Sequence, residues 1–140
     1  MEMWVVFALL AAVFAAAVAV LGKIGVAGVD PTVATAVRSA VMTVFLLGST
    51  VALGKISAFR EVGSRPLVFV ALSGVAGALS WLFYFWALKL GPASGVAAID
   101  RSSVVLVLVL AALFLSEPLN WRSGMGAVLV TLGAVLMAWR

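Results

Sequence analysis

The chain has 140 residues, of which 66% are apolar and only 10% charged, whereas soluble domains carry roughly 45–50% apolar and about 25% charged residues. This excess excludes a water-soluble globular fold. Cys and His are absent, which excludes disulfides, thiolate or imidazole metal sites and Ser-His or Cys-His nucleophile pairs. The formal net charge of +4 comes from scattered Lys and Arg between apolar runs, a distribution typical of membrane-flanking charges rather than nucleic-acid-binding patches. We therefore expect an integral membrane protein with no cofactor, metal or nucleic-acid partner.

Five apolar runs are long enough to cross a bilayer as helices, which takes about 20 residues each. They occupy residues 3–21, 32–53, 67–88, 93–115 and 121–139. Each is continuously apolar and about twice as long as the ten-residue alternating strands of a membrane barrel. The predicted fold is an all-α membrane protein, a five-transmembrane-helix bundle in a single domain over residues 1–140.

The first run differs from a cleaved signal sequence. It has no basic start, because Glu2 is its only early charge, and it exceeds the 7–15 apolar residues usual for a signal core. We expect it to be retained as a helix.

Tryptophans mark several predicted span ends, where interfacial rings are favoured: Trp4, Trp121 and Trp139. Trp81 and Trp86 instead lie inside the third run, on either side of Tyr84. They contact lipid and neighbouring helices, or they form an aromatic wall that lines a substrate cavity; the sequence leaves both interpretations open.

Small residues at four- or seven-residue spacing predict close contacts between helices in lipid. The pairs are Ser73 and Gly77, Gly91 and Gly95, and Gly126 and Gly133.

Charged residues inside spans are rare and usually functional. Arg38 lies about six residues into the second run and Asp100 about eight into the fourth, roughly 9–12 Å deep at 1.5 Å per residue. Both runs start from the same side of the membrane, so an Arg38–Asp100 ion pair is geometrically possible. Arg101 is adjacent to Asp100, and Lys23 and Lys89 flank spans on that side.

Two interpretations of these charges remain. They form a basic cavity that binds a substrate or couples to an ion, or they are helix staples with lysines reaching lipid headgroups. We favour the cavity for Arg38, Asp100 and Arg101, and the structural role for Lys89. Ser102 and Ser103 could bind a ligand, but back-bonding to their own helix is the more common use of a single hydroxyl.

Basic residues are nearly balanced between the two sides of the membrane. The side of the N-terminus has four, and the other side has three: Lys55, Arg60, Arg65 and Arg122 against Lys23, Lys89 and Arg140. Weak bias allows insertion in both orientations. Because inverted repeats are a common transporter architecture, an odd number of spans with dual topology predicts an antiparallel homodimer.

Two segments carry a resemblance to a known family. The first consists of Leu21-Gly22-Lys23-Ile24-Gly25, Asp30, Ala34-Thr35 and Arg38. The second consists of Ser80-Trp81-Leu82, Tyr84-Phe85, Ala87-Leu88, Leu90 to Ser94, Val96, Ile99-Asp100-Arg101 and Ser103, followed by Glu117 and the glycines of the fifth run. The chain resembles the single-domain, half-size EamA proteins of the drug/metabolite transporter superfamily. Three positions depart from the family pattern. Ala98 replaces a Pro, which predicts a straighter fourth helix, Trp86 replaces a frequent basic residue, and Ser116 replaces a Gly.

The resemblance implies a transporter of small metabolites or drug-like solutes in a prokaryotic inner (plasma) membrane, and no enzyme. We expect alternating access by a homodimer and, from the basic balance, an anionic or zwitterionic solute. The candidate substrate-binding or coupling residues are Lys23, Arg38, Trp81, Tyr84, Trp86, Asp100, Arg101 and Ser103. The alternative is a non-transporting scaffold or lipid-binding subunit whose buried ion pairs are structural.

Overall fold

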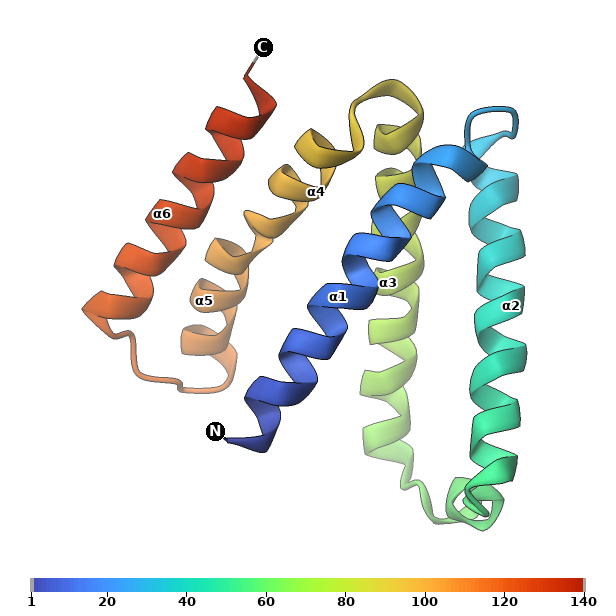
Figure 1. Ribbon diagram of the computed structural model, residues 1–140. Coiled ribbons are helices and arrows are strands. Elements are labelled where there is room, and N and C mark those ends of the chain that lie inside the picture. The colour runs from blue at the N-terminus through green and yellow to red at the C-terminus, as the bar shows by residue number, and fades with distance from the viewer. Residues whose placement is uncertain (1, 140) are drawn as a thin grey trace. The chain divides into compact units, whose positions relative to one another are not determined.

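A computed structural model describes residues 2–139, with the side chain of Arg60 excepted. Its elements are α1 (Met3–Gly25), α2 (Pro31–Ala52), the 3-10 helix η1 (Ile56–Glu61), α3 (Ser64–Leu90), α4 (Ala93–Arg101), α5 (Ser103–Phe114) and α6 (Trp121–Ala138) (Figure 1). Five stretches are long and apolar enough to cross a membrane: α1, α2, α3, α4 with α5, and α6. The predicted all-α bundle of five spans is confirmed. Arg140, counted above among the basic residues, lies outside the described residues.

Local sequence explains where α2 and α6 begin. The Asp30 carboxylate accepts hydrogen bonds from the backbone N–H groups of Thr32 (2.8 Å) and Val33 (3.2 Å), which would otherwise lack partners at the helix end. Pro31 follows at the first helical position, where its missing N–H costs nothing. Asn120 caps α6 in the same way, accepting from the N–H of Arg122 at 3.1 Å.

The fourth span is interrupted rather than straight. At Ser102 the backbone changes to tighter turns, because its N–H donates to the Ile99 carbonyl (3.0 Å) and its own carbonyl accepts from Val105 (3.1 Å). The Ser102 hydroxyl donates to the same Ile99 carbonyl at 2.6 Å. The backbone at Ala98 itself is helical, and the tighter turns lie just after Asp100 and Arg101. The straightening effect expected of Ala98 stays a prediction. The predicted back-bonding of Ser102 is confirmed.

The chain forms two compact units. One comprises residues 25–89, with α2 and α3 antiparallel and joined through η1 (Figure 1). The other comprises the chain up to Ile24 and from Leu90, with α1, α4, α5 and α6. The single-domain interpretation stays a prediction.

Within the second of these units, α4 lies against the C-terminal part of α6 at Gly95. A Cβ atom at Gly95 would stand 3.3 Å from Pro92 Cγ and 3.8 Å from both Ala138 Cα and the Met137 carbonyl oxygen. The close backbone approach predicted for Gly95 is therefore present. It is absent at Gly126 and Gly133, where a Cβ would meet no described atom within 4 Å. On α6 the buried small residues are instead Ala127 and Ala134.

Two connections place a residue in the left-handed region of backbone space. Gly54 has φ of 65° after α2, and Ser116 has φ of 55° after α5. A residue of this conformation often ends a helix, and glycine adopts it without the penalty that a Cβ brings. Ser116 therefore carries strain that the glycine of the family pattern would not.

Most large apolar side chains on the spans are exposed. The buried apolar side chains of the described chain are Ala19, Val26, Phe85, Leu88, Ala127 and Ala134. Exposure of apolar surface on this scale is untenable in water but expected for helices that contact lipid. The protein is an integral membrane protein whose helices contact the bilayer.

Candidate functional site: an arginine on an aromatic helix face

Arg38 on α2 reaches the aromatic face of α3 within the unit of residues 25–89. Its guanidinium carbon lies 3.6 Å from the centroid of the Trp81 ring and 5.9 Å from that of Phe85. The side chain is half-buried. Cation–π contacts of this kind contribute about 0.5–1 kcal/mol when exposed and about 2 kcal/mol when desolvated. The contact therefore helps to hold a charge inside a span.

The spacing of the aromatic residues on α3 explains which of them meet. Trp81, Tyr84 and Phe85 are three and four residues apart, so they share one helix face. The Trp81 ring makes edge-to-face contacts with Tyr84 (centroids 5.3 Å apart, 71° between planes) and with Phe85 (6.2 Å, 66°). Of the two interpretations of the aromatic residues, helix packing holds for Phe85, which is buried. Trp81, which contacts the arginine, and Tyr84, which contacts Trp81, are half-buried.

Trp86 lies away from this cluster. It follows Trp81 by five residues, which places it about 140° around the helix. It is 42% exposed. Its role as a cavity-lining residue stays a prediction, and the Arg38 cluster gives it no support.

The hydroxyl groups of α2 are used within their own helix. Thr35 donates to the Pro31 carbonyl (2.7 Å), Ser39 to Thr35 (2.9 Å) and Thr43 to Ser39 (2.9 Å). Such back-bonding satisfies polar side chains at membrane depth. Within the described part of the unit of residues 25–89, the contacts found for the Arg38 guanidinium are those with the Trp81 and Phe85 rings.

Lys89 is held by backbone carbonyls. Its ammonium, half-buried at the end of α3, donates to the carbonyl oxygens of Val26 (2.7 Å), Ala27 (3.0 Å) and Val29 (3.3 Å). An ammonium has three N–H donors, and three acceptors face it. The predicted structural role is supported, but the partners are protein carbonyls of the α1–α2 connection rather than lipid headgroups.

Lys23, in the other unit, also donates a hydrogen bond to a backbone carbonyl. It is the basic residue of the last turn of α1, and its ammonium donates to the Gly91 carbonyl at 2.9 Å. This places Lys23 on the short turn between α3 and α4. Its predicted contribution to substrate binding is untested.

The remaining candidate residues lie around the break in the fourth span. Asp100 is half-buried on α4, Arg101 ends α4 and is exposed, and Ser103 begins α5 and is exposed. Asp100 and Arg38 belong to different units, and their ion pair stays a prediction. In the described chain, no group of three or more His, Cys, Asp or Glu residues could hold a metal ion.

Sequence reasoning missed two features of this region. Phe85 was not among the candidates, although its position one helical turn after Trp81 was a usable signal. The carbonyl acceptors of Lys89 could not be found from side-chain patterns, because backbone groups carry no sequence signature.

A comparison with family models decides the classification, because the model of the EamA-like transporter family matches residues 2–139. The chain belongs to the EamA-like transporter family. One EamA relative, described as "Uncharacterized transporter in cobO 3'region" from Sinorhizobium sp, is 41% identical over 137 residues, covering 98% of this chain and 97% of the relative. No solved structure matches this EamA chain. The resemblance recognised in the sequence is confirmed at the level of the family.

Proposed function

We propose that this EamA protein transports small anionic or zwitterionic metabolites, or drug-like solutes with such groups, by alternating access. The observation that carries the proposal is the Arg38 guanidinium carbon, which lies over the Trp81 ring at 3.6 Å from its centroid inside a membrane span. Stacking through its face leaves the edge of a guanidinium, with its N–H donors, available to a ligand. A carboxylate or phosphate accepts two parallel hydrogen bonds from that edge. Tyr84 and Trp81 would supply an amphipathic wall for the rest of the solute.

The other candidate residues are included in this proposal because they are expected at a similar depth in the membrane. Arg38 lies seven residues after the start of α2, and Asp100 lies seven residues after the start of α4. With five spans, both helices start from the same side, about 10 Å above these residues at 1.5 Å per residue. Lys23, Asp100, Arg101 and Ser103 are therefore proposed to line the same solute path, with Asp100 as the residue that couples or balances charge. The break at Ser102 supports a mobile fourth span, since tighter turns inside a helix often mark hinges.

Transport assays in liposomes test the role of Arg38. Uptake of succinate, alanine and glucose 6-phosphate is compared with that of ethidium, a cationic probe. We expect uptake of at least one anionic or zwitterionic probe by the wild type, and uptake at the protein-free level by Arg38→Met. Arg122→Met, which removes a positive charge from the first turn of α6, should transport normally. Ethidium as the sole transported probe, or normal uptake of the anionic probes by Arg38→Met, would contradict the proposal.

Asp100→Asn separates transport from assembly. The variant should lose uptake while it elutes with the wild-type oligomer in size-exclusion chromatography. Unchanged uptake would remove Asp100 from the mechanism. Unchanged uptake by both Asp100→Asn and Arg38→Met would favour the scaffold or lipid-binding alternative. In that alternative the charged side chains only hold segments of the protein together, as Lys89 does.

We also propose that the active unit is a single-domain homodimer in the inner membrane, assembled from antiparallel copies. Support comes from the odd number of spans and from the near balance of basic residues between the two sides. Activity reporters fused to the C-terminus test the arrangement. Signals from both sides of the membrane are expected, whereas a signal from one side alone would exclude antiparallel pairing.

A further inference from the structure

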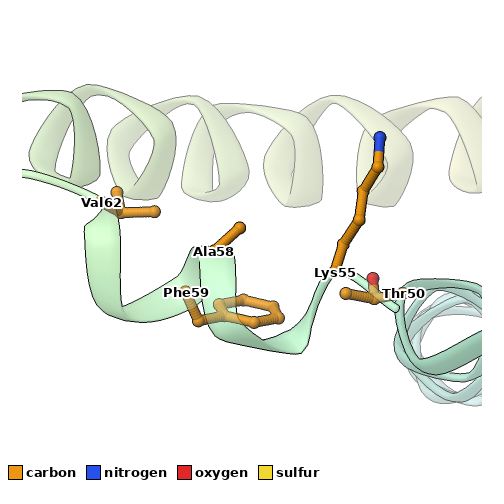
Figure 2. A pocket seen from close by; sticks show the side chains of 5 residues that line it. All are labelled: Thr50, Lys55, Ala58, Phe59 and Val62. Carbon is orange, nitrogen blue, oxygen red and sulfur yellow. The ribbon is translucent and has the colours of Figure 1, made fainter. Parts of the chain in front are cut away.

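The connection between α2 and α3 carries a feature that the proposed transport site does not use. It combines the short helix η1 with a shallow, open hollow of about 210 Å³, lined by Thr50, Lys55, Ala58, Phe59 and Val62. Drug-sized ligands usually occupy pockets of about 300–1,000 Å³, so this hollow would hold only a part of a ligand, such as a short acyl segment. In Figure 2, Lys55 and Val62 stand at opposite ends of the hollow, with Ala58 and Phe59 between them.

The hollow is lined by apolar surface, and the Lys55 ammonium lies beyond its rim. Lys55 is exposed, and in the described chain its ammonium makes no side-chain hydrogen bond or ion pair. Figure 2 shows its side chain extended away from the Phe59 ring. Phe59 and Val62 are part of the apolar lining, at 61% and 44% exposure. This pairing of an unsatisfied cation with apolar surface matches an amphiphile that has an anionic group.

Helix η1 presents an apolar row. Ile56 and Phe59 are three residues apart, and a 3-10 helix has three residues per turn, so these side chains align on one side. Val62 follows directly after η1, three residues beyond Phe59, and extends the apolar row. The row starts four residues after the end of α2, the second span, and Val62 precedes the third by two residues. It therefore lies at the membrane surface, where an apolar row flanked by basic residues is typical of a segment embedded in the headgroup layer. Residues 55–65 contain three basic residues, Lys55, Arg60 and Arg65, against one acidic residue, Glu61.

We infer that this connection is a binding site for an anionic phospholipid. The Lys55 ammonium pairs with the lipid phosphate beside the hollow, while Ile56, Phe59 and Val62 lie among the upper acyl segments. The site is separate from the proposed transport function, because it uses none of the residues around Arg38. The results of the transport assays and of the lipid-binding measurements are therefore independent of each other.

Native mass spectrometry of the full-length protein in detergent, with added phosphatidylglycerol or phosphatidylcholine, tests the inference. The Lys55→Gln variant should bind phosphatidylglycerol about fivefold more weakly, the weight of one basic residue at an anionic surface. Its binding of phosphatidylcholine should not change. The matched control Arg122→Gln, which loses the same charge outside the hollow, should bind both lipids like the wild type. Equal phosphatidylglycerol binding by Lys55→Gln and wild type would overturn the inference.

Two further measurements distinguish a lipid site from a site for free phosphate. Phe59→Ser should also weaken phosphatidylglycerol binding, and soluble glycerol 3-phosphate should not displace the lipid at equal concentration. Displacement together with normal binding by Phe59→Ser would identify a phosphate site and overturn the lipid assignment. If Lys55→Gln does not fold, Lys55→Arg serves instead and should retain binding. In the wild type, raising salt from 0.1 M to 1 M shortens the screening length from about 10 Å to about 3 Å and should weaken phosphatidylglycerol binding; salt-independent binding would contradict the role of the ammonium.

Discussion

The guanidinium of Arg38 on α2 lies 3.6 Å from the ring centroid of Trp81 on α3, so that one cation–π contact joins two consecutive spans. An uncompensated arginine at mid-bilayer costs about 2.5–3.5 kcal/mol on insertion scales. The aromatic ring recovers part of this cost, and in the proposed function the N–H donors of Arg38 bind the solute. This contact is both a structural link and the basis of the proposed anion recognition.

A double-mutant cycle measures the link. Arg38→Met, Trp81→Leu and the double variant are unfolded in mixed micelles, and we expect a coupling free energy of about 1 kcal/mol between the two sites. Trp81→Phe should retain part of the coupling, because a phenyl ring still offers its face to the cation. Additive effects of Arg38→Met and Trp81→Leu would show that the contact contributes nothing to stability.

Replacing Lys89 on α3 removes the three N–H donors that bind backbone carbonyls of the α1–α2 connection. Lys89→Met should lower the free energy of unfolding by about 1.5–3 kcal/mol, the range for hydrogen bonds to charged groups. The control is Arg65→Met, at the opposite end of the same helix. It removes a positive charge from the first turn of α3, so stability should stay the same or rise slightly. A stability of Lys89→Met equal to that of Arg65→Met would mean that the carbonyls of Val26, Ala27 and Val29 need no ammonium.

Two substitutions with opposite expected effects on stability test the strain of the left-handed backbone conformation at Ser116 and Gly54. Ser116→Gly should raise the free energy of unfolding by about 1 kcal/mol, because glycine adopts φ of 55° without strain. Gly54→Ala should lower it by a similar amount. A Cβ at Gly54 would meet no described atom within 4 Å, so only its φ of 65° opposes the change. Thermal or denaturant unfolding of both variants provides the measurement, and a destabilised Ser116→Gly would be the contrary result.

Gly95 and Gly126 form a matched pair for the contact between α4 and α6. Gly95→Leu should separate the two helices, because even a Cβ would stand 3.3 Å from Pro92 and 3.8 Å from backbone atoms of α6. Gly126→Leu gains the same helix propensity but meets open space. The first variant should therefore be about 1–3 kcal/mol less stable than the second, which is the usual cost of overpacking. Equal stabilities in unfolding experiments would show that α4 and α6 do not pack closely at Gly95.

The sequence by itself determined the number and the helical nature of the spans. Inside lipid every backbone N–H and C=O must bond within its own segment, so a continuous apolar run of about 20 residues has one stable form. The polar motif from Lys23 to Arg38 and the one from Trp81 to Ser103 also placed the chain in its family. Neither result needs knowledge of which helices touch.

Tertiary structure alone decided which side chains meet. The guanidinium of Arg38 meets the ring of Trp81 because α2 and α3 lie side by side, a contact that the sequence did not predict. The sequence also did not predict the backbone carbonyls that bind Lys89. Nor did it distinguish Gly95 as the glycine that lies close to another helix, because Gly126 and Gly133 have similar spacing in the sequence and yet face open space. In lipid, apolar burial does not drive helices together, so pairing depends on side-chain shape and on a few polar contacts that hydropathy does not encode.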